Sequence, residues 1–298
     1  MQAETKKEKI KFLNEYVIRT TAAEGGPFHP SASSNYPPQS EPIEVAYSGG
    51  KDSDVILQLV REAGIPYRAI YKCATIDPPG TIAHVRQMGV EIMKPRKTFF
   101  QLIAEAGLPN QRYRFCCHFL KEYKVLDKAV IGVRRDESVK RGLRYQEPTE
   151  CRFYGSKKEH VEAIYPILDW TTDDVAEFLQ DRGIRCAPVY YDEDGTFHPE
   201  RRLGCLCCPM QYTKRRIQSF QQYPRMVRLY LKHAQMWWDN PKHDGSSMKR
   251  RYDDVYEWFV RDLFYDSTKK FEADKNSLFG RPDYKQMLED FFGIDLTL

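Results

Sequence analysis

Residues 48–53 read Ser48-Gly49-Gly50-Lys51-Asp52-Ser53, between a strand-like run at residues 43–47 and an amphipathic helical run at residues 53–62. Adjacent glycines let a backbone turn sharply and approach a ligand closely, and the N–H groups that open a helix point at an anion. Lys51 adds a mobile cation, and the two serines add hydroxyl donors. An ordinary turn can also read Ser-Gly-Gly, but the strand before it and the helix after it favour a phosphate-binding loop.

Strand-like and helix-like segments continue to alternate after this loop. Such alternation predicts an α/β fold with a doubly wound, mostly parallel sheet and helices on both faces. Ligands of these sheets bind outside the carboxyl ends of the strands, so the loops after Tyr47, Lys72 and Val133 should face one site. Further strands are expected at residues 67–72, 90–93 and 129–133, and helices at residues 53–62, 81–88, 98–106 and 117–128.

Two further helix signals follow in the second half of the chain. A capping box predicts a helix that starts at Thr171, and Pro224 should break or kink a helix over residues 214–238. Composition then divides the chain into three regions: an N-terminal extension and linker at residues 1–40, an α/β domain at 41–212, and a basic, aromatic-rich helical region at 213–298. Within the first region, residues 3–20 could form a short polar helix.

Composition also indicates the cellular location of the protein and the state of its cysteines. The net charge is +4 over 298 residues, and the N-terminus is charged rather than apolar. No stretch approaches the ~18 apolar residues of a membrane span. We therefore expect a cytoplasmic protein without a membrane partner. The cytosol keeps thiols reduced, so the eight cysteines should not be paired as disulfides.

The cysteines are clustered in the manner of metal ligands. Cys116 and Cys117 form one pair, and Cys205 and Cys208 form another. Four thiolates can hold a [4Fe–4S] cluster or a zinc ion. Neighbouring side chains diverge, which suits the separated iron corners of a cluster better than one tetrahedral zinc. Buried structural cysteines without a metal are the alternative interpretation.

Several cations follow the strand expected at residues 129–133. Gly132 is followed by Arg134, Arg135 and Ser138 at the expected carboxyl end of that strand, and Arg141 lies one helical turn further on. Arginine guanidinium groups at such a position can fork onto phosphate or sulfate oxygens. A surface ion-pair cluster with the neighbouring acidic residues 136 and 137 is the alternative.

Taken together, these segments resemble one family. The loop at residues 48–53 is similar to the PP-loop of ATP pyrophosphatases, which split ATP between its α- and β-phosphates, and it lacks the spacing of a Walker loop. The whole set resembles the phosphoadenosine phosphosulfate (PAPS) reductase-like family of adenine-nucleotide α-hydrolases. Four segments carry the resemblance: residues 48–53, residues 114–121, residues 132–141, and residues 166–175 running on to 204–210.

This resemblance implies an adenine-nucleotide site for ATP, adenylyl sulfate or PAPS. Lys51, Asp52, Arg134 and Arg135 would be the catalytic residues, and the cysteine set is similar to the iron–sulfur ligands of adenylyl-sulfate reductases. The implied nucleotide-binding residues are Ser48, Gly49, Gly50, Lys51, Asp52, Ser53, Gly132, Arg134, Arg135 and Ser138, and the implied [4Fe–4S] ligands are Cys116, Cys117, Cys205 and Cys208.

Two departures from the reductases shift the expected activity. Those reductases use a cysteine in a C-terminal tail, and no cysteine follows Cys208 here. Their phosphate loop is usually degenerate, whereas Gly49 to Asp52 are intact. The intact loop is similar to that of the ATP sulfurylase small subunit, which lacks the cysteine set. It is also similar to that of the ATP pyrophosphatases of DNA phosphorothioation and tRNA thiolation, which combine an intact loop with an iron–sulfur cluster.

The first hypothesis is therefore an ATP pyrophosphatase that adenylates an acceptor for sulfur transfer, with an iron–sulfur cluster. DNA or tRNA would be the acceptor, and a protein such as a cysteine desulfurase would supply sulfur. Mg²⁺ would bridge the phosphates, with Asp52 as its nearest candidate ligand and Asp77 as a second, although Asp77 also suits a turn.

Two other functions stay open from the sequence. A thiol-dependent reductase of adenylyl sulfate or PAPS would use Cys207 or another internal cysteine as its nucleophile. A non-catalytic subunit that binds nucleotide and nucleic acid would use residues 213–251, which hold ten Lys/Arg against two Asp/Glu and several aromatics. Aromatics at helical spacing more often form a core, which is the simpler interpretation of that region.

Overall fold

The computed structural model describes residues 41–154, 159–264 and 282–298. The expected helix at residues 3–20 and the linker after it lie outside the described residues. Within the described ranges, no helix is long and apolar enough to cross a membrane. The chain separates into two compact units, and the second consists of residues 74–77, 95–121 and 204–298.

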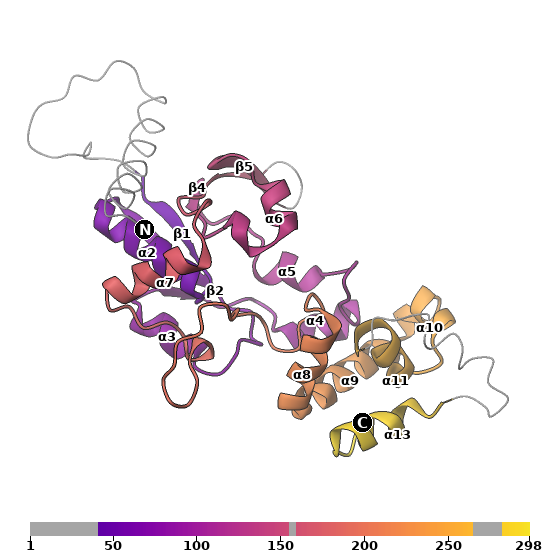
Figure 1. The fold of residues 1–298 in the computed structure, drawn as a ribbon. Helices are drawn as coiled ribbons and strands as arrows, with labels where there is room; N and C mark the ends of the chain where they lie inside the picture. The colour runs from indigo at the N-terminus through magenta and orange to yellow at the C-terminus, as the bar shows by residue number, and fades with distance from the viewer. Residues whose placement is uncertain (1–40, 155–158, 265–281) are drawn as a thin grey trace, which may run out of the picture. The chain divides into compact units, whose positions relative to one another are not determined.

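The first unit is built on one six-stranded sheet (Figure 1). Its strand order is β3-β2-β1-β4-β6-β5, and every neighbouring pair is parallel except β5 and β6. The doubly wound, mostly parallel α/β fold is confirmed. The strands are β1 (Ile43–Tyr47), β2 (Tyr67–Lys72), β3 (Glu91–Met93), β4 (Lys128–Val130), β5 (Thr149–Tyr154) and β6 (Glu159–Ile164).

The hairpin of β5 and β6 was not expected from the sequence. Both strands mix charged and apolar residues, and β5 lies at the edge of the sheet. Strands of this composition lack the continuous apolar run that marks a buried parallel strand, so their signal in the sequence is weak.

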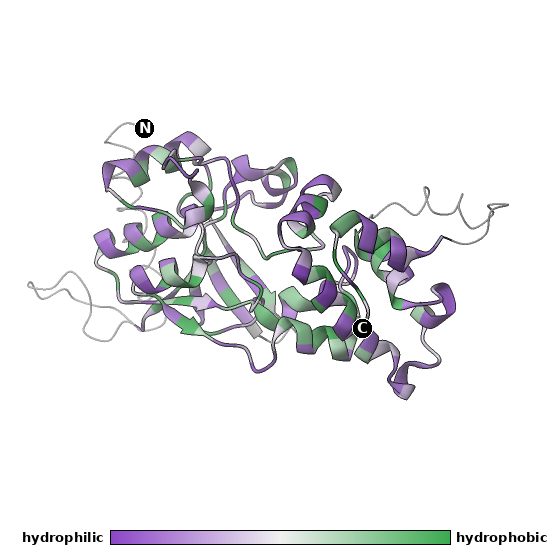
Figure 2. Cartoon of the chain, turned by 90° about the horizontal axis from the view of Figure 1, so that it is seen from below, coloured by the Kyte–Doolittle hydropathy of each residue, from purple (hydrophilic) through white to green (hydrophobic). Residues whose placement is uncertain are grey.

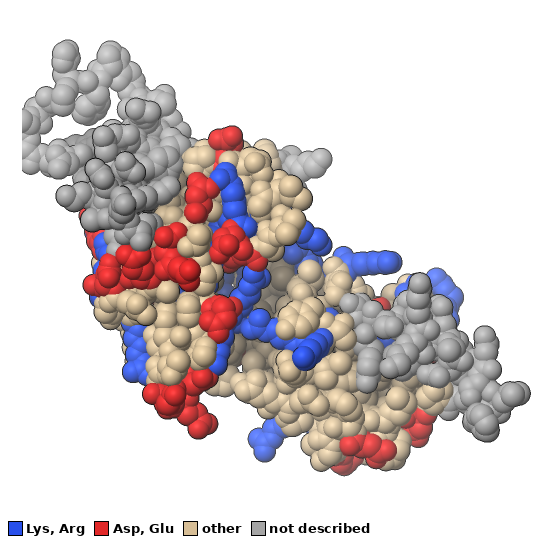
Figure 3. Space-filling view, viewed as in Figure 1, with Lys and Arg blue, Asp and Glu red and all other residues tan. Residues whose placement is uncertain are grey.

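Helices of the first unit follow the expected pattern closely. Helix α2 (Lys51–Ala63) starts directly after the glycine loop, buries an apolar face that includes Val55, Leu59 and Val60, and ends at Gly64 in the left-handed region. Helix α7 (Thr172–Asp181) begins with the expected capping box of Thr171, and acidic side chains gather over it (Figure 3). The other helices are α3 (Thr81–Gln87) and α6 (Val139–Arg144).

The second unit is helical. The expected break at Pro224 is confirmed, because α8 ends at Gln222 and Pro224 is the first residue of α9. The helix expected at residues 117–128 is wrong in its extent, since α5 ends at Leu120. The helices are α4 (Phe99–Ala106), α5 (Phe115–Leu120), α8 (Thr213–Gln222), α9 (Pro224–Trp238), α10 (Ser247–Arg251), α11 (Val255–Trp258) and α13 (Tyr284–Phe292).

The aromatic residues of α8 and α9 mostly form the core of this unit. Phe220, Tyr230 and Trp237 are buried, and Tyr230 packs edge-on against Phe220 and Phe99. In Figure 2, individual helices carry both hydrophobic and hydrophilic residues, as is typical of amphipathic helices that pack against a core. The simpler interpretation of these three aromatics therefore holds.

Candidate functional site

The phosphate loop connects β1 to α2 in a tight, internally bonded turn. Gly49 has a φ of 78°, in the left-handed region, and a Cβ atom there would lie 3.1 Å from Thr81 Cγ2. The Ser53 hydroxyl donates to the Gly50 carbonyl at 2.6 Å, and Gly50 N–H donates to Ser48 Oγ at 3.4 Å. The local sequence therefore fixes the loop, and its serines hold it in shape.

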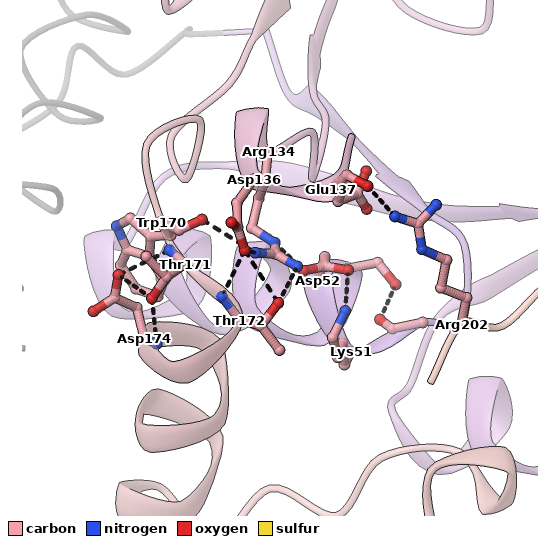
Figure 4. Close-up of polar contacts among 12 residues, drawn as sticks. Lys51, Asp52, Arg134, Asp136, Glu137, Trp170, Thr171, Thr172, Asp174 and Arg202 are labelled. Carbon is pink, nitrogen blue, oxygen red and sulfur yellow. Dashed lines mark hydrogen bonds and ion pairs between the residues drawn. The ribbon is translucent and has the colours of Figure 1, made fainter. Parts of the chain in front are cut away.

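Asp52 is the centre of the charged groups at this loop. Lys51 Nζ lies 2.8 Å from one carboxylate oxygen of Asp52, and Arg134 Nε lies 2.6 Å from the other (Figure 4). Arg134 is only 1% exposed and also donates to the Trp170 carbonyl at 3.1 Å. Asp52 follows the carboxyl end of β1, and Arg134 follows the carboxyl end of the neighbouring parallel strand β4. The two residues meet there, as expected for a parallel sheet.

Arg202 is a site residue that the sequence argument missed. Its guanidinium donates to the Glu137 carbonyl, and the Glu137 carboxylate pairs with Arg141. Burial and the positive charge of Arg202 lower the pKa of Arg141 below its ordinary value. Neighbouring guanidinium groups favour an anion between them. The Arg-Arg-Leu-Gly run just before the second cysteine pair was the available signal.

The side chains of Arg135 and Ser138 lie at the surface and have partners other than Asp52. Arg135 Nε donates to the Tyr145 carbonyl at 2.8 Å, and its guanidinium pairs with Asp169. The backbone at Arg134 is extended, so consecutive side chains point to opposite sides. Ser138 Oγ accepts from the Arg141 N–H and caps α6.

Gly132 lies where a side chain would collide with the phosphate loop. A Cβ atom at this position would be 3.0 Å from the Asp52 carbonyl oxygen. Gly132→Ala should therefore cost about 1–3 kcal/mol of stability and weaken nucleotide binding, because backbone must move to make room. Urea unfolding and nucleotide titration measure both effects.

Gly142→Ala is the matched control for that substitution. Gly142 lies in α6, where the nearest atom to an added Cβ is 3.7 Å away. Alanine in place of glycine inside a helix should stabilise the protein by roughly 0.5–1 kcal/mol. Equal effects of the two substitutions would contradict a specific clash at Gly132.

A buried polar network lies directly beside the loop and was not anticipated. Asp54, on α2, is fully buried and accepts a hydrogen bond from the Tyr47 hydroxyl. His84 Nε2 lies 2.9 Å from Asp54 and 3.0 Å from the Tyr47 oxygen. Burial raises the pKa of Asp54 above its ordinary 3.8, against the hydrogen bonds from His84, Tyr47 and Cys186 that lower it.

The raised pKa of Asp54 predicts a pH dependence of stability. Between 3.8 and the higher pKa of the folded state, the folded chain binds the proton more tightly than the unfolded chain, so stability falls as pH rises through this interval. Asp54→Asn should flatten this part of the curve. Urea midpoints measured from pH 4 upwards for both proteins test it, and parallel curves would contradict it.

All four expected ligand cysteines line one pocket in the second unit. The pocket has a cavity volume of about 20 Å³ and is partly open to solvent. Its walls otherwise come mainly from apolar residues, including Ile76, Phe99 and Leu120. Lys121 and four cysteines complete the lining: Cys116, Cys117, Cys205 and Cys208.

Burial raises the pKa of the Cys205 thiol, against the charge and hydrogen bond of Lys121, which lower it. Lys121 is hydrogen-bonded to Cys205, and the negative charges of Cys205 and Asp77 raise the pKa of the lysine, against burial, which lowers it. Asp77 accepts from the Ala74 N–H at 3.1 Å, which makes it a turn residue here. Thr75 and Cys207, next to lining residues, both have left-handed backbones, with φ of 62° and 52°. Such strained residues cluster at functional sites.

Cys207 faces away from the four pocket cysteines into the core. Its thiol is fully buried and accepts from the Ser219 hydroxyl at 3.7 Å. The Cys207 carbonyl accepts from Tyr230 at 3.1 Å. The backbone of Cys207 is left-handed, which interrupts the regular alternation of side chains. Cys205 and Cys208, on either side of Cys207 in the sequence, both line the pocket.

The four cysteines at the pocket supply the thiol donors that both a zinc ion and an iron–sulfur cluster take. Among the described residues, no three His, Cys, Asp or Glu side chains are close enough to hold one metal ion. A zinc ion needs its thiolates about 2.3 Å from one centre. A [4Fe–4S] cluster takes one thiolate at each of four separated irons, and the four cysteines lie around one pocket.

Comparison with known proteins gives a family match over most of the α/β region. The model of the phosphoadenosine phosphosulfate reductase domain matches residues 42–211. A Methanocaldococcus jannaschii protein is 26% identical over 204 residues, covering 62% of this chain and 40% of its own length. Sulfate adenylyltransferase subunit 2 of Bacteroides thetaiotaomicron is 25% identical over 183 residues, covering 50% of this chain and 60% of its own.

The chain thus matches less than two thirds of these relatives' length. Among solved structures, the phosphoadenylyl-sulfate reductase of Candida auris aligns with a TM-score of 0.39 and 14% identity, covering 63% of this chain and 90% of that one. The FMN adenylyltransferase of Candida glabrata aligns with a TM-score of 0.39 and 14% identity, covering 62% and 59%.

Proposed function

The chain belongs to the phosphoadenosine phosphosulfate reductase domain family, and from that premise we propose that it is an ATP pyrophosphatase that adenylates an acceptor for sulfur transfer. One observation carries the proposal: the intact loop with Lys51 and Arg134 both paired to Asp52 beside it. The relative named sulfate adenylyltransferase subunit 2 supports adenylyl chemistry.

The loop residues would act on the phosphates of ATP. An acceptor oxygen attacks the α-phosphorus, the bond from that phosphorus to the α–β bridging oxygen breaks, and pyrophosphate leaves with the electron pair. Lys51 moves from Asp52 to the phosphates and offsets the charge that develops on the leaving group. Arg134 keeps Asp52 in place through its 2.6 Å contact. Asp52 would be the nearest residue to hold a Mg²⁺ ion, which would supply further positive charge to the phosphates when bound.

The outer arginines would orient the anionic end of the substrate. Arg141 and Arg202 share Glu137 as a partner, so their guanidinium groups are held near each other before a ligand arrives. Preorganised cations need no reordering when charge develops on a phosphate. Arg135 is paired with Asp169, so it would contact the substrate only at the outer surface of this site.

The four pocket cysteines would hold a [4Fe–4S] cluster as resident cofactor. A bound cluster would carry or position the sulfur that replaces the adenylated oxygen. Lys121 places a positive charge beside Cys205, which opposes the burial that raises the pKa of this thiol, and ligation requires the thiolate form. The reductase alternative receives no support from Cys207, because that thiol is fully buried and hydrogen-bonded to Ser219.

Incubation with ATP labelled at the α-phosphate tests the proposal. The full chain, prepared anaerobically, should release pyrophosphate together with an equal amount of labelled AMP, free or bonded to the acceptor, and faster when an acceptor is present. Adenylyl sulfate and PAPS are offered in parallel with a thiol reductant, and sulfite is measured. Sulfite without ATP cleavage would overturn the pyrophosphatase in favour of the reductase.

A further inference from the structure

The Tyr190 hydroxyl lies against the phosphate loop. Tyr190 ends the short helix η2 (Pro188–Tyr190) and is 2% exposed. Its oxygen accepts a hydrogen bond at 3.3 Å from the backbone N–H of Lys51, which lies 139 residues earlier in the chain. A Cβ atom on Gly50 would lie 3.2 Å from the same oxygen. The tertiary fold therefore brings a buried polar atom to the start of α2.

Hydrogen bonds hold Tyr190 in this position from several sides. The Tyr190 N–H donates to the Ala187 carbonyl at 3.1 Å, and the Tyr190 carbonyl accepts from the His198 N–H at 2.7 Å. The hydroxyl oxygen also accepts from the Leu203 N–H at 3.3 Å. The hydroxyl is thus positioned before a ligand arrives, and a preorganised group loses little freedom when the ligand binds.

The hydroxyl proton of Tyr190 has no acceptor among the residues that the structure describes. The N–H groups of Lys51 and Leu203 already point at the oxygen, and a hydroxyl that accepts two hydrogen bonds still has one proton to donate. The nearby Gly50 carbonyl accepts from the Ser53 hydroxyl at 2.6 Å. Because buried donors are nearly always satisfied in native proteins, this proton calls for an acceptor from outside the chain.

The surroundings of Tyr190 keep the proton on its oxygen. Burial raises the pKa of Tyr190 above its ordinary value, and the negative charge of Asp52 raises it further, against the N–H groups of Lys51 and Leu203, which lower it. The hydroxyl is therefore a neutral donor at neutral pH. Lys51 Nζ lies 5.9 Å from the centre of the Tyr190 ring, so the cation of the loop is close to this donor.

The first turn of α2 indicates what the acceptor is. The N–H groups of a first turn have no partners within their own helix, and phosphate loops use such groups to bind anions. The Lys51 N–H belongs to this turn and bonds to the Tyr190 oxygen. An anion bound at this turn would lie within reach of the hydroxyl proton.

We propose that Tyr190 is a phosphate-binding residue, whose hydroxyl donates to an oxygen of the phosphate group held by the loop. The ligand class is a nucleotide polyphosphate or free pyrophosphate. The inference deepens the proposed function by adding a residue to its nucleotide site. It rests on that function only for the presence of a phosphate in the loop, since a hydrogen bond needs no cleavage of ATP.

Titration calorimetry with two phosphate ligands tests this contact. The ligands are pyrophosphate and an ATP analogue that has a methylene group between its α- and β-phosphates and is not cleaved there. Tyr190→Phe removes the hydroxyl and keeps the ring. It should weaken the binding of both ligands at least about tenfold, the effect expected from the loss of one hydrogen bond to a charged group.

Tyr165→Phe is the matched control. Tyr165 is 1% exposed in the same compact unit, and its hydroxyl donates to Glu150 at 2.6 Å. The control therefore loses a buried hydroxyl whose partner is not a loop residue, and its affinity for both ligands should equal that of the wild type. Urea unfolding checks that each variant is folded under the conditions of the titration.

A measurement on the unsubstituted chain reports on the hydroxyl itself and does not depend on the stability of any variant. Tyrosine labelled with carbon-13 at Cζ is incorporated at position 190 alone, and in a second sample at position 165 alone. Pyrophosphate should move the Tyr190 resonance in the direction of the phenolate form, because donation to an anion increases the negative charge on the phenol oxygen. The Tyr165 resonance should stay in place.

Two results would overturn the assignment of Tyr190: an unchanged pyrophosphate affinity in Tyr190→Phe, or a Tyr190 resonance that pyrophosphate does not move. Cleavage of α-labelled ATP is measured with the same wild-type protein. Cleavage together with either of those results would refute the role of Tyr190 alone. Pyrophosphate binding that depends on Tyr190, without cleavage of ATP, would refute the pyrophosphatase and keep the phosphate contact.

Discussion

Replacing Lys51 with methionine should lower the rate of pyrophosphate release by about 10²- to 10³-fold, the usual cost of removing one preorganised charge donor from a transition state. The Lys51 ammonium is the cation of the loop and lies 2.8 Å from Asp52. The fold should survive, because Asp52 keeps its 2.6 Å contact with Arg134. Single-turnover measurements with saturating ATP separate this loss from weaker binding.

Lys97→Met is the control for that experiment. Lys97 is half exposed and pairs with Glu105 in the second unit, so its loss should change neither rate nor stability appreciably. A Lys51→Met protein with the wild-type rate and the wild-type unfolding curve would remove the loop from the catalytic machinery. The intact sequence of residues 48–53 would then be explained by nucleotide binding alone.

Cys116→Ser/Cys205→Ser should abolish cluster binding, because it removes one ligand from each of the two cysteine pairs that line the pocket. Serine cannot replace a thiolate as a soft ligand for iron. Iron and acid-labile sulfide, measured after anaerobic reconstitution, should fall from the full complement of a [4Fe–4S] cluster to background. The broad visible absorption should disappear with them.

Cys151→Ser is the matched control, since Cys151 lies exposed on β5 of the sheet unit. It should keep its full iron content. Stoichiometric zinc without iron in the wild-type protein would contradict the cluster, and so would iron that persists in the double variant. ATP cleavage by the double variant in the absence of an acceptor should continue, because the nucleotide residues belong to the other compact unit.

Local signals predicted much of the fold. The glycine loop, the strands at residues 43–47 and 67–72, and the capping box at Thr171 all depend on residues within one or two turns of each other, and the structure has them where expected. The β5–β6 hairpin did not give such a signal, because β5 lies at the edge of the sheet and both strands mix charged and apolar residues. Helix α5 ended early, at Leu120.

Within the candidate site, sequence proximity was a poor guide to side-chain direction. Arg134 and Arg135 are consecutive, yet one is buried against Asp52 and the other pairs with Asp169 on the surface. Arg202 is 65 residues away from Glu137 and bonds to its carbonyl. Backbone direction at each residue decided these outcomes, and it depends on packing around the whole sheet.

The sequence by itself determined the kind of loop at residues 48–53, the alternation that builds the sheet, and the two cysteine pairs, because each depends on short-range spacing and backbone geometry. Only the tertiary structure decided that four cysteines share a pocket with Lys121, that Asp54 is buried among Tyr47 and His84, and which aromatics stay exposed. These facts depend on contacts between distant segments, whose geometry is set by packing of the complete chain.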